Sequence, residues 1–526
     1  MRVTKSVREC FGANIPLLHR VVLAGMVGGL LIANATAAQA GTPWAWGWNR
    51  AGEVGDGTTS IRSTPVQVTG LTNVTGVAAG GDHGLAVKLD GTVWAWGENF
   101  GGQLGDGTNT NRLTPVQVSG LTDVVAVSAG ETHSLAVKSD QTVWAWGAGA
   151  NGELGDGAAT NRLTPVQVTG LTDVVAVSAG GYYSLALKSD GTLWAWGAGS
   201  YGQLGDGATT DRHMPVQVSG LTNVMAIAAG AYHNLALKSD GTLWAWGVNA
   251  NSLLGDGTAT DRLTPVQVSG LTNVVAVAAS GTLSLAVRSD KTLWAWGIRL
   301  NCDGTQTFIN TPQQVIGLTD VVAVAAGSGH GLAVKSDGTA WAWGDNTFGQ
   351  LGDSTTTCRL TPVQVSGLTN VAAVDSGSYY FSFALVRDPA ESFLPQNPTV
   401  AMTVKSNTMA IDDLFTVNFS FAPGTGINPL TEAVSLRVGS FSATIPAGSF
   451  QFKPAKRNQP AQYAYTGTIN GVSLTVKISL LGGNSFEFRA AGNGANLAGT
   501  VNPVTLAVML GNDQGQATVT AQITNR

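Results

Sequence analysis

The sequence predicts an all-β protein, namely a seven-bladed β-propeller followed by a smaller β-sandwich-like domain. The main observation is a Trp-Ala-Trp-Gly motif that returns seven times. The first six copies begin fifty residues apart, from Trp44 to Trp294, and the seventh begins forty-seven residues later at Trp341. A fixed period of this size indicates a repeat architecture. Each repeat also holds four short segments typical of β-strands, which matches the four-stranded blade of a propeller.

The first 40 residues have the features of a secretory signal peptide. Basic residues precede the apolar run 21–33, and Ala38-Gln39-Ala40 provides a small-residue cleavage site after Ala40. The alternative, a retained membrane anchor, needs a longer apolar run without glycine interruptions. We therefore expect a secreted or periplasmic protein whose mature chain has no membrane span.

Composition narrows the class of partner. Charged residues make up 12% of the chain and apolar residues 44%, so most of the chain must fold. The net charge is −5 and becomes more negative once the basic leader is removed. Because nucleic-acid-binding proteins need a basic face, we expect no nucleic-acid partner.

The repeat beginning at Trp94 illustrates the four expected strands. We name them segment a (94–97), segment b (115–118), segment c (124–130) and segment d (135–138). They are rich in apolar and β-branched residues and are bounded by Gly, Pro, Asn or Asp, as short strands usually are. The Ser-Asp-Gly-Thr sequence between segment d and the next segment a is typical of a tight hairpin turn.

The two tryptophans of segment a should point to the same face of the sheet, because side chains alternate along a strand. We expect all fourteen rings to fill the wedges between adjacent blades. Segment c is apolar on both faces, which indicates a strand buried on both sides.

Ring closure follows from the order of the segments. The mature chain begins with a segment a (43–47), and the seventh repeat ends with a segment d (383–386) that no Trp segment follows. Pairing of these two segments would close a ring of seven blades and leave no exposed edge there. The expected domains are therefore a signal peptide (1–40), a propeller (41–388), a linker (389–398) and a β-sandwich (399–526), the last from alternating apolar stretches separated by Gly/Asn turns.

Loop variability predicts where binding occurs. Strands alternate in direction, so the a–b and c–d loops emerge on one face, and they vary in sequence while the turns of the opposite face barely change. Aromatic residues on a variable loop face are typical interface anchors. The alternative is that they cover the mouth of the propeller and bind nothing. The candidate partner-binding residues are Trp48, Phe100, Tyr182, Tyr183, Tyr201, Tyr232, Tyr379 and Tyr380.

Other polar patterns have structural interpretations. His83, His133, His233 and His330 recur at one loop position, but equivalent points on neighbouring blades are too far apart for a shared zinc ion. The recurring Leu-Gly-Asp-Gly aspartates are turn residues rather than calcium ligands. We expect the acids Asp82, Glu98, Glu131 and Asp345 to be scattered on the variable face without partners, and we expect no catalytic residues, metal or cofactor.

Two cysteines remain after removal of the leader. Cys302 and Cys358 fall in loops of neighbouring repeats. A disulfide is possible in an oxidising compartment, but the sequence does not give the Cα separation that a bridge needs. Two free thiols are the alternative.

Several separated motifs recur in a constant order. They include Trp96-Gly-Glu-Asn99 with Gly102-Gln-Leu-Gly105, and Ala229-Gly-Ala-Tyr-His233 with Leu235-Ala-Leu-Lys238. This pattern resembles the regulator of chromosome condensation repeat over about residues 43–388, in a bacterial secreted form. The resemblance implies a seven-bladed propeller that acts as a protein-binding platform. Members of that family include a nucleotide-exchange factor for a small GTPase, ligase subunits, a plant photoreceptor and a secreted inhibitor of β-lactamases.

The sequence thus predicts an exported, monomeric, non-catalytic scaffold that binds an unknown protein through one aromatic loop face. One alternative is a module that binds glycans or cell surfaces by aromatic stacking. The other is guanine-nucleotide exchange by analogy with the family, although an exported protein would not meet a cytosolic GTPase.

Overall fold

The computed structural model describes residues 40–387 except Tyr379, and ten strands between Thr403 and Ala521. The chain divides into two compact units with a boundary after Arg387. Every regular element in the described residues is a β-strand. Those residues contain no helix with the length and hydropathy needed to span a membrane. The predicted signal peptide, apart from Ala40, and the predicted linker 389–398 lie outside the described residues.

Each repeat forms four strands that correspond to the four expected segments. The a strands are β1 (Gly41–Gly47), β5 (Val93–Gly97), β9 (Val143–Gly147), β13 (Leu193–Gly197), β17 (Leu243–Gly247), β21 (Leu293–Leu300) and β25 (Ala340–Gly344). The b strands are β2 (Arg62–Gln67), β6 (Arg112–Gln117), β10 (Arg162–Gln167), β14 (Arg212–Gln217), β18 (Arg262–Gln267), β22 (Gln306–Gln314) and β26 (Arg359–Gln364).

The remaining two strands of each repeat are the most buried. The c strands are β3 (Val74–Ala79), β7 (Val124–Ala129), β11 (Val174–Ala179), β15 (Val224–Ala229), β19 (Val274–Ala279), β23 (Val321–Ala326) and β27 (Val371–Ser376). The d strands are β4 (His83–Lys88), β8 (His133–Lys138), β12 (Tyr183–Lys188), β16 (His233–Lys238), β20 (Leu283–Arg288), β24 (His330–Lys335) and β28 (Phe381–Arg387).

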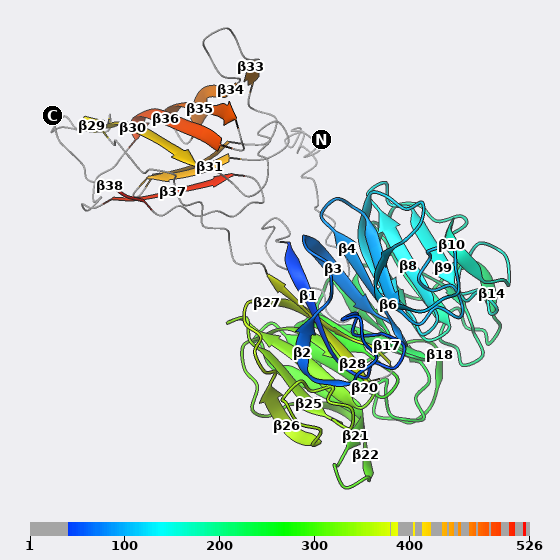
Figure 1. The fold of residues 1–526 in the computed structure, drawn as a ribbon. Coiled ribbons are helices and arrows are strands. Elements are labelled where there is room, and N and C mark those ends of the chain that lie inside the picture. Colours follow the sequence, from blue (N-terminus) through cyan, green and yellow to red (C-terminus); the bar gives the residue numbers. More distant parts are fainter. Residues whose placement is uncertain are drawn as a thin grey trace, which may run out of the picture. The chain divides into compact units, whose positions relative to one another are not determined.

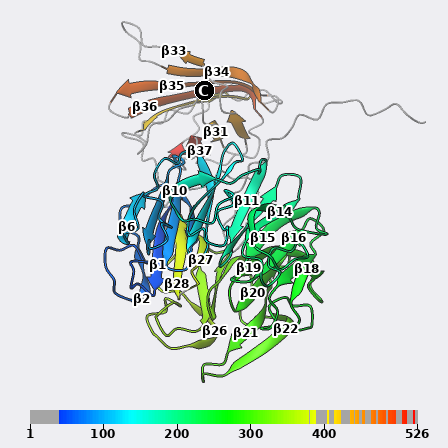
Figure 2. The ribbon, with the colours of Figure 1, turned by 90° about the vertical axis from the view of Figure 1, so that its right-hand side faces the viewer.

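These strands form seven four-stranded antiparallel groups in the order c-d-a-b. Six groups use consecutive strands, from β3–β6 to β23–β26, and the seventh joins β27 and β28 to β1 and β2. Neighbouring c strands contact one another around a complete cycle that returns from β27 to β3. This arrangement is consistent with a seven-bladed β-propeller (Figures 1 and 2), with the c strands innermost and the exposed b strands outermost.

The two ends of the repeat region meet in one blade, as expected. Strand β1 pairs with β28 along its whole length, from Gly41 opposite Arg387 to Gly47 opposite Phe381. A further pair, Gly41 with Val74, links this closing blade to the next one. The pairing leaves neither strand with a free edge.

The tryptophans pack between blades, but their burial is unequal. Trp46, Trp96, Trp146, Trp196, Trp246 and Trp296, each the second of its pair, are completely buried. The first tryptophan of every pair is only partly buried and lies at the edge of the same interblade cluster. The prediction that fourteen rings fill the wedges was therefore wrong for the first of each pair and for Trp343, which is also partly exposed.

Each buried indole is held by the a–b loop of the preceding blade. We call the segments 53–57, 103–107, 153–157, 203–207, 253–257 and 350–354 the glycine loops. In each of them the carbonyl of the first residue accepts a hydrogen bond of 2.7–3.0 Å from the indole N–H of the next blade. The third residue is a glycine at positive φ, and a Cβ there would lie within 3 Å of the ring, as at Gly205 against Trp246.

The repeat that contains β21 departs from this pattern. Strand β21 continues to Leu300 and pairs with a longer β22 to form an extended hairpin (Figure 1). No glycine loop is present in this described repeat. A disulfide between Cys302 and Cys358, with a Cα separation of 5.5 Å, joins the hairpin to the following blade.

The second unit contains two antiparallel sheets. The larger has the order β29-β30-β36-β35-β34-β33 and the smaller has the order β32-β31-β37-β38. Face-to-face packing of these sheets as a β-sandwich remains a prediction. The strands are β29 (Thr403–Lys405), β30 (Asp413–Phe421), β31 (Val434–Val438), β32 (Phe441–Ile445), β33 (Gln451–Lys453), β34 (Gln462–Ile469), β35 (Val472–Gly482), β36 (Ser485–Ala495), β37 (Val504–Leu510) and β38 (Val519–Ala521).

A comparison of two glycines tests the role of the glycine loop. Gly205 and Gly220 both have positive φ, but a Cβ at Gly220 meets no atom within 4 Å. We expect Gly220→Ala to lower the free energy of unfolding by about 1 kcal/mol through backbone strain alone. Gly205→Ala should cost about 2 kcal/mol more, because its methyl group overlaps the Trp246 ring. Chemical denaturation measures both, and equal losses would contradict the proposed contact.

The disulfide gives a second test. Cys302 and Cys358 are 56 residues apart in sequence. The double variant Cys302→Ser, Cys358→Ser should lower the free energy of unfolding by about 2–4 kcal/mol, because the unfolded chain loses a cross-link. A reducing agent should lower the denaturation midpoint of the wild type and leave that of the double variant unchanged. A wild-type midpoint that does not respond to reduction would contradict the expected stabilisation.

Candidate protein-binding surface

The a–b and c–d loops share one face of the propeller, which we call the loop face. The backbone N–H of Trp48 in an a–b loop donates to the carbonyl of Tyr380 in a c–d loop. Equivalent bonds join Glu98 to Asp82 and Ala198 to Tyr182. The b–c and d–a turns are tied to each other at the opposite ends of the strands, and we call this side the turn face.

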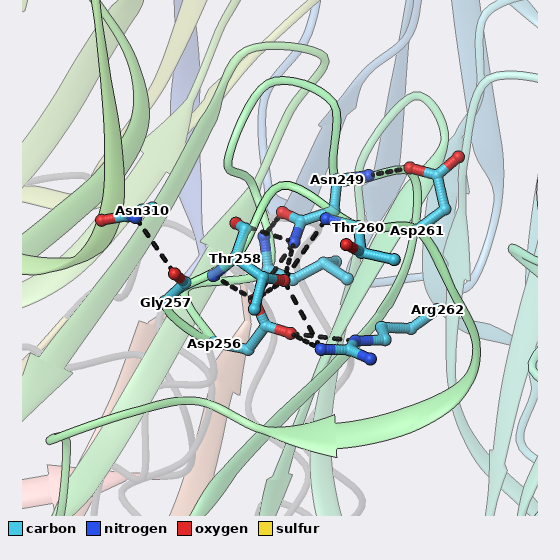
Figure 3. Close-up of polar contacts among 9 residues, drawn as sticks. Asn249, Asp256, Gly257, Thr258, Thr260, Asp261, Arg262 and Asn310 are labelled. Carbon is cyan, nitrogen blue, oxygen red and sulfur yellow. Dashed lines mark hydrogen bonds and ion pairs between the residues drawn. The ribbon is translucent and has the colours of Figure 1, made fainter.

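Side-chain hydrogen bonds hold the a–b loops rigid, as Figure 3 shows for the loop between β17 and β18. The Asn249 amide donates to Asp256 and to the carbonyl of Thr258, and its oxygen accepts from the backbone of Leu254. Asp256 also forms an ion pair of 2.7 Å with Arg262. Burial acts to raise the pKa of Asp256, but hydrogen bonds from Thr258 and Arg262 outweigh it and lower the pKa. The loop is therefore a fixed support for exposed side chains.

We predicted these aspartates as turn residues but did not predict their arginine partners. Asp56, Asp106, Asp156, Asp206, Asp256 and Asp353 each pair with an arginine six residues later in the chain. The recurring Asp and Arg at this constant spacing were a visible signal. The pairing joins the glycine loop to the first residue of its own b strand.

Three tyrosines on the loop face form what we call the tyrosine cluster. Tyr232 lies 5.4 Å from Tyr201 and 6.4 Å from Tyr182, measured between ring centroids. Tyr201 is 51% exposed, whereas the other two are partly buried. The cluster joins an a–b loop and a c–d loop of blade β11–β14 to the c–d loop of blade β15–β18.

A second group, the mixed aromatic cluster, repeats this geometry elsewhere on the face. Phe348 lies 4.6 Å from Trp48 and 5.3 Å from Tyr380 between ring centroids. The Arg50 guanidinium stacks 4.7 Å from the Trp48 ring. Phe348 was not among the predicted site residues, although it precedes Gln350 by two positions just as Tyr201 precedes Gln203.

The remaining predicted binding residues differ in their exposure to solvent. Tyr183 is completely buried, and its hydroxyl donates toward the Asn234 side chain and the carbonyls of Gly230 and His233. Its assignment to the binding surface was wrong, because it occupies the inward position that histidine takes in other repeats. Phe100 is 74% exposed. Tyr379 lies outside the described residues.

Acidic side chains gather on the loop face, contrary to the prediction that they are scattered. Burial raises the pKa of Asp82 to about 8, and the nearby carboxylate of Glu53 adds to the shift. Glu98 and Glu131 raise the Asp82 pKa further. These four residues, which we call the acidic group, come from the closing blade and the next two blades. The sequence did not reveal this grouping because the four acids occupy different loop positions in different repeats.

The recurring histidines belong to an interblade hydrogen-bond network. Ser134 donates to the carbonyl of Gln103, so its oxygen accepts from Nε2–H of His83 at 2.9 Å. This assigns the tautomer and leaves Nδ1 of the buried ring without a partner. His133, His233 and His330 make the same bond to Ser184, Ser284 and Ser382. Among the described residues, no three His, Cys, Asp or Glu side chains are placed to hold a metal ion.

Comparison with known families supports the sequence resemblance. Residues 14–307 match the family described as RCC1-like domain. The chain belongs to the RCC1-like domain family. Regulator of chromosome condensation (RCC1) repeats match residues 321–350 and 337–385 as well. No curated protein matches this chain.

Solved structures show the same fold. Prp20p from Saccharomyces cerevisiae, described with its binding to Gsp1p and histones, is 25% identical, with a TM-score of 0.60. That match covers 67% of this chain and 93% of Prp20p. Human WBSCR16 is 22% identical with a TM-score of 0.61, and the match covers 66% of this chain and all of that one. Yeast RCC1 (Prp20) bound to Kap60 is 23% identical with a TM-score of 0.62, and the match covers 74% and 97% of the two chains.

The histidine network predicts an acid-sensitive fold. Burial lowers the pKa of His133 to about 4, so its neutral ring stabilises the folded state fully above pH 6.5 and less as the pH falls toward 4. Between pH 7 and pH 5 this one group should cost about 2 kcal/mol of unfolding free energy. The double variant His133→Tyr, Ser184→Asn copies the Tyr183–Asn234 pair and should lose about 2 kcal/mol less over that range. Parallel pH profiles from chemical denaturation would contradict this account.

Proposed function

We propose that this chain is an exported, non-catalytic scaffold that binds a protein partner through its loop face. The observation that supports this most strongly is the repetition of one aromatic arrangement at two blade interfaces. In both, an a–b ring (Tyr201 or Phe348) contacts a c–d ring of the following blade (Tyr232 or Tyr380). Clustered aromatic side chains with large contact area and few rotatable bonds are typical hot spots of protein interfaces.

The loop face is also prepared for binding because its loops are already ordered. The loops that carry these rings have their own hydrogen bonds: the backbone N–H of Tyr201 donates to the Gln203 side chain, and the Asn346 amide beside Phe348 donates to Asp353. Binding of a partner therefore causes little further loss of conformational entropy in these loops. Rigid presentation of a few aromatic residues is sufficient for recognition without any catalytic group.

The acidic group indicates the chemistry of the partner. Along the ring of blades, the acidic group follows the mixed aromatic cluster and precedes the tyrosine cluster. Burial and the nearby charge of Glu131 raise the pKa of Tyr232, a member of the tyrosine cluster. We propose that the partner places a lysine or arginine over these carboxylates and apolar side chains over the rings. Binding should then weaken as the salt concentration rises.

Two alternatives involve other partners. The exposed rings of Tyr201 and Phe100 could stack on sugars, as proposed for a glycan-binding module. Guanine-nucleotide exchange would follow the binding to Gsp1p described for Prp20p. A glycan array and a nucleotide-release assay with small GTPases test these two proposals directly, and negative results in both would leave protein binding.

The proposed surface can be tested by capture from the extracellular fraction with purified protein. The double variant Tyr201→Ala, Tyr232→Ala should reduce affinity for the captured partner at least about tenfold, because two interface anchors are lost. Leu89→Ala is the matched control, since Leu89 is 51% exposed on the turn face. A partner captured equally by the tyrosine variant and the wild type would bind elsewhere and would contradict the proposal.

A further inference from the structure

The interface between blade β19–β22 and blade β23–β26 has an unfilled position. At the six other blade interfaces of the described propeller, a glycine loop of one blade covers the second tryptophan of the next. The extended β21–β22 hairpin has no such loop, so Trp343 faces a cavity of about 240 Å³. The cavity therefore lies where the other blades place part of their own backbone.

The six intact interfaces show what this position accepts. At the loop 103–107, Gln103 presents its carbonyl to the Trp146 indole, Leu104 is completely buried, and Gly105 lies against the ring. The carbonyl of Gly105 accepts from the backbone N–H of Ser119, and the N–H of Gly107 donates to the carbonyl of Leu163 in the next blade. Carbonyl, branched aliphatic side chain and glycine thus follow one another along a short peptide.

The groups that would meet this peptide are present but unpaired at the open interface. The Trp343 indole N–H has no hydrogen-bond partner among the described residues, in contrast to its six counterparts. The backbone N–H of Ile316 corresponds to that of Ser119, and in the described part of the chain no loop carbonyl reaches it. Likewise, no described loop amide reaches the carbonyl of Leu360, which corresponds to Leu163.

The apolar side chains around the cavity are exposed for the same reason. Val315 is partly exposed, whereas the equivalent valines of the other repeats, such as Val268, are buried. Leu360 is 58% exposed, compared with 39% for Leu263 at the same strand position. The hairpin replaces the arginine of other b strands by Ile309, which also lines the cavity. The site therefore combines an apolar wall with two free donors and one free acceptor.

We propose that this cavity binds a peptide segment of another protein that supplies the missing glycine loop. The segment would carry a branched aliphatic residue followed by glycine. Its aliphatic side chain would fill the apolar cavity, and the carbonyl before that residue would accept the Trp343 indole N–H. The glycine is required because a Cβ at this place overlaps the ring at every intact interface. Arg299, which lines the cavity and has no ion-pair partner in the described residues, would pair with a carboxylate after the glycine.

This site is separate from the proposed aromatic surface. The hairpin and the strands β25 and β26 supply most of its lining residues, and none of the residues of the tyrosine cluster lines it. The disulfide between Cys302 and Cys358 attaches the hairpin to the neighbouring blade and so holds the wall in place while the loop position stays open.

A labelled hexapeptide tests the proposal. The peptide Gln-Leu-Gly-Asp-Gly-Thr has the sequence of residues 103–108 and is titrated with the full chain in fluorescence anisotropy. We expect saturable one-to-one binding, weakened at least about tenfold when the peptide leucine or its first glycine is replaced by alanine. Trp343→Phe should weaken binding about fivefold to tenfold, because the phenyl ring keeps the stacking surface but lacks the N–H donor.

Matched variants separate binding from folding. Leu360→Asp should abolish binding of the hexapeptide, whereas Leu263→Asp, at the equivalent position covered by the glycine loop 203–207, should leave it unchanged. Melting temperatures establish that each variant is folded. The double variant Tyr201→Ala, Tyr232→Ala should retain hexapeptide binding, which distinguishes this site from the aromatic surface. Absence of saturable binding up to about 1 mM peptide, or equal binding of the alanine-substituted peptides, would overturn the proposal.

Discussion

The contact between an indole ring and the glycine loop of the preceding blade organises six of the seven blade interfaces of the propeller. The ring is large enough to fill the wedge between two sheets, but its N–H must find a partner once water is excluded. The loop provides that partner as a backbone carbonyl and allows close approach because glycine has no Cβ. One short segment thus satisfies the polar atom, packs the ring and positions the next blade.

This contact also explains how the loop face can be variable and rigid at once. The glycine that lies against the indole is the same in all six glycine loops, because a Cβ at this position would overlap the ring. Residues such as Tyr201 and Phe348 point away from that contact and are free to differ. Hydrogen bonds from the Gln203 and Gln350 side chains to the backbone N–H groups of Tyr201 and Phe348 hold this part of each loop. Recognition can therefore change through side chains alone, without loss of the blade packing.

A second set of interblade contacts depends on the matching of side-chain size. His83 bonds to Ser134 across one interface, and the larger Tyr183 bonds to Asn234 at the equivalent place. At the closing blade, Phe381 occupies the inward position and its neighbour in the next blade is a glycine. The inward residue and the residue that faces it differ together from one interface to the next. A tyrosine at this position is therefore a packing residue, even though the c–d loop before it lies on the loop face.

The sequence by itself determined the strand order, the number of repeats and the closure of the ring. These features follow from local periodicity and from the unpaired segments at the two ends, and both are readable along a single chain. It could also place most of the aromatic residues on one face, because strand direction alternates regularly. Local patterns give no distances between residues of different blades, however, and burial depends on those distances.

The tertiary structure therefore decided what the repeat pattern left open. It placed Tyr183 inside, brought Phe348 to Trp48, gathered the acidic group from three blades and joined Cys302 to Cys358. It also showed that the altered repeat before Trp343 leaves a cavity rather than a rearranged loop. Each of these outcomes depends on contacts between blades, and such contacts exist only in the folded propeller.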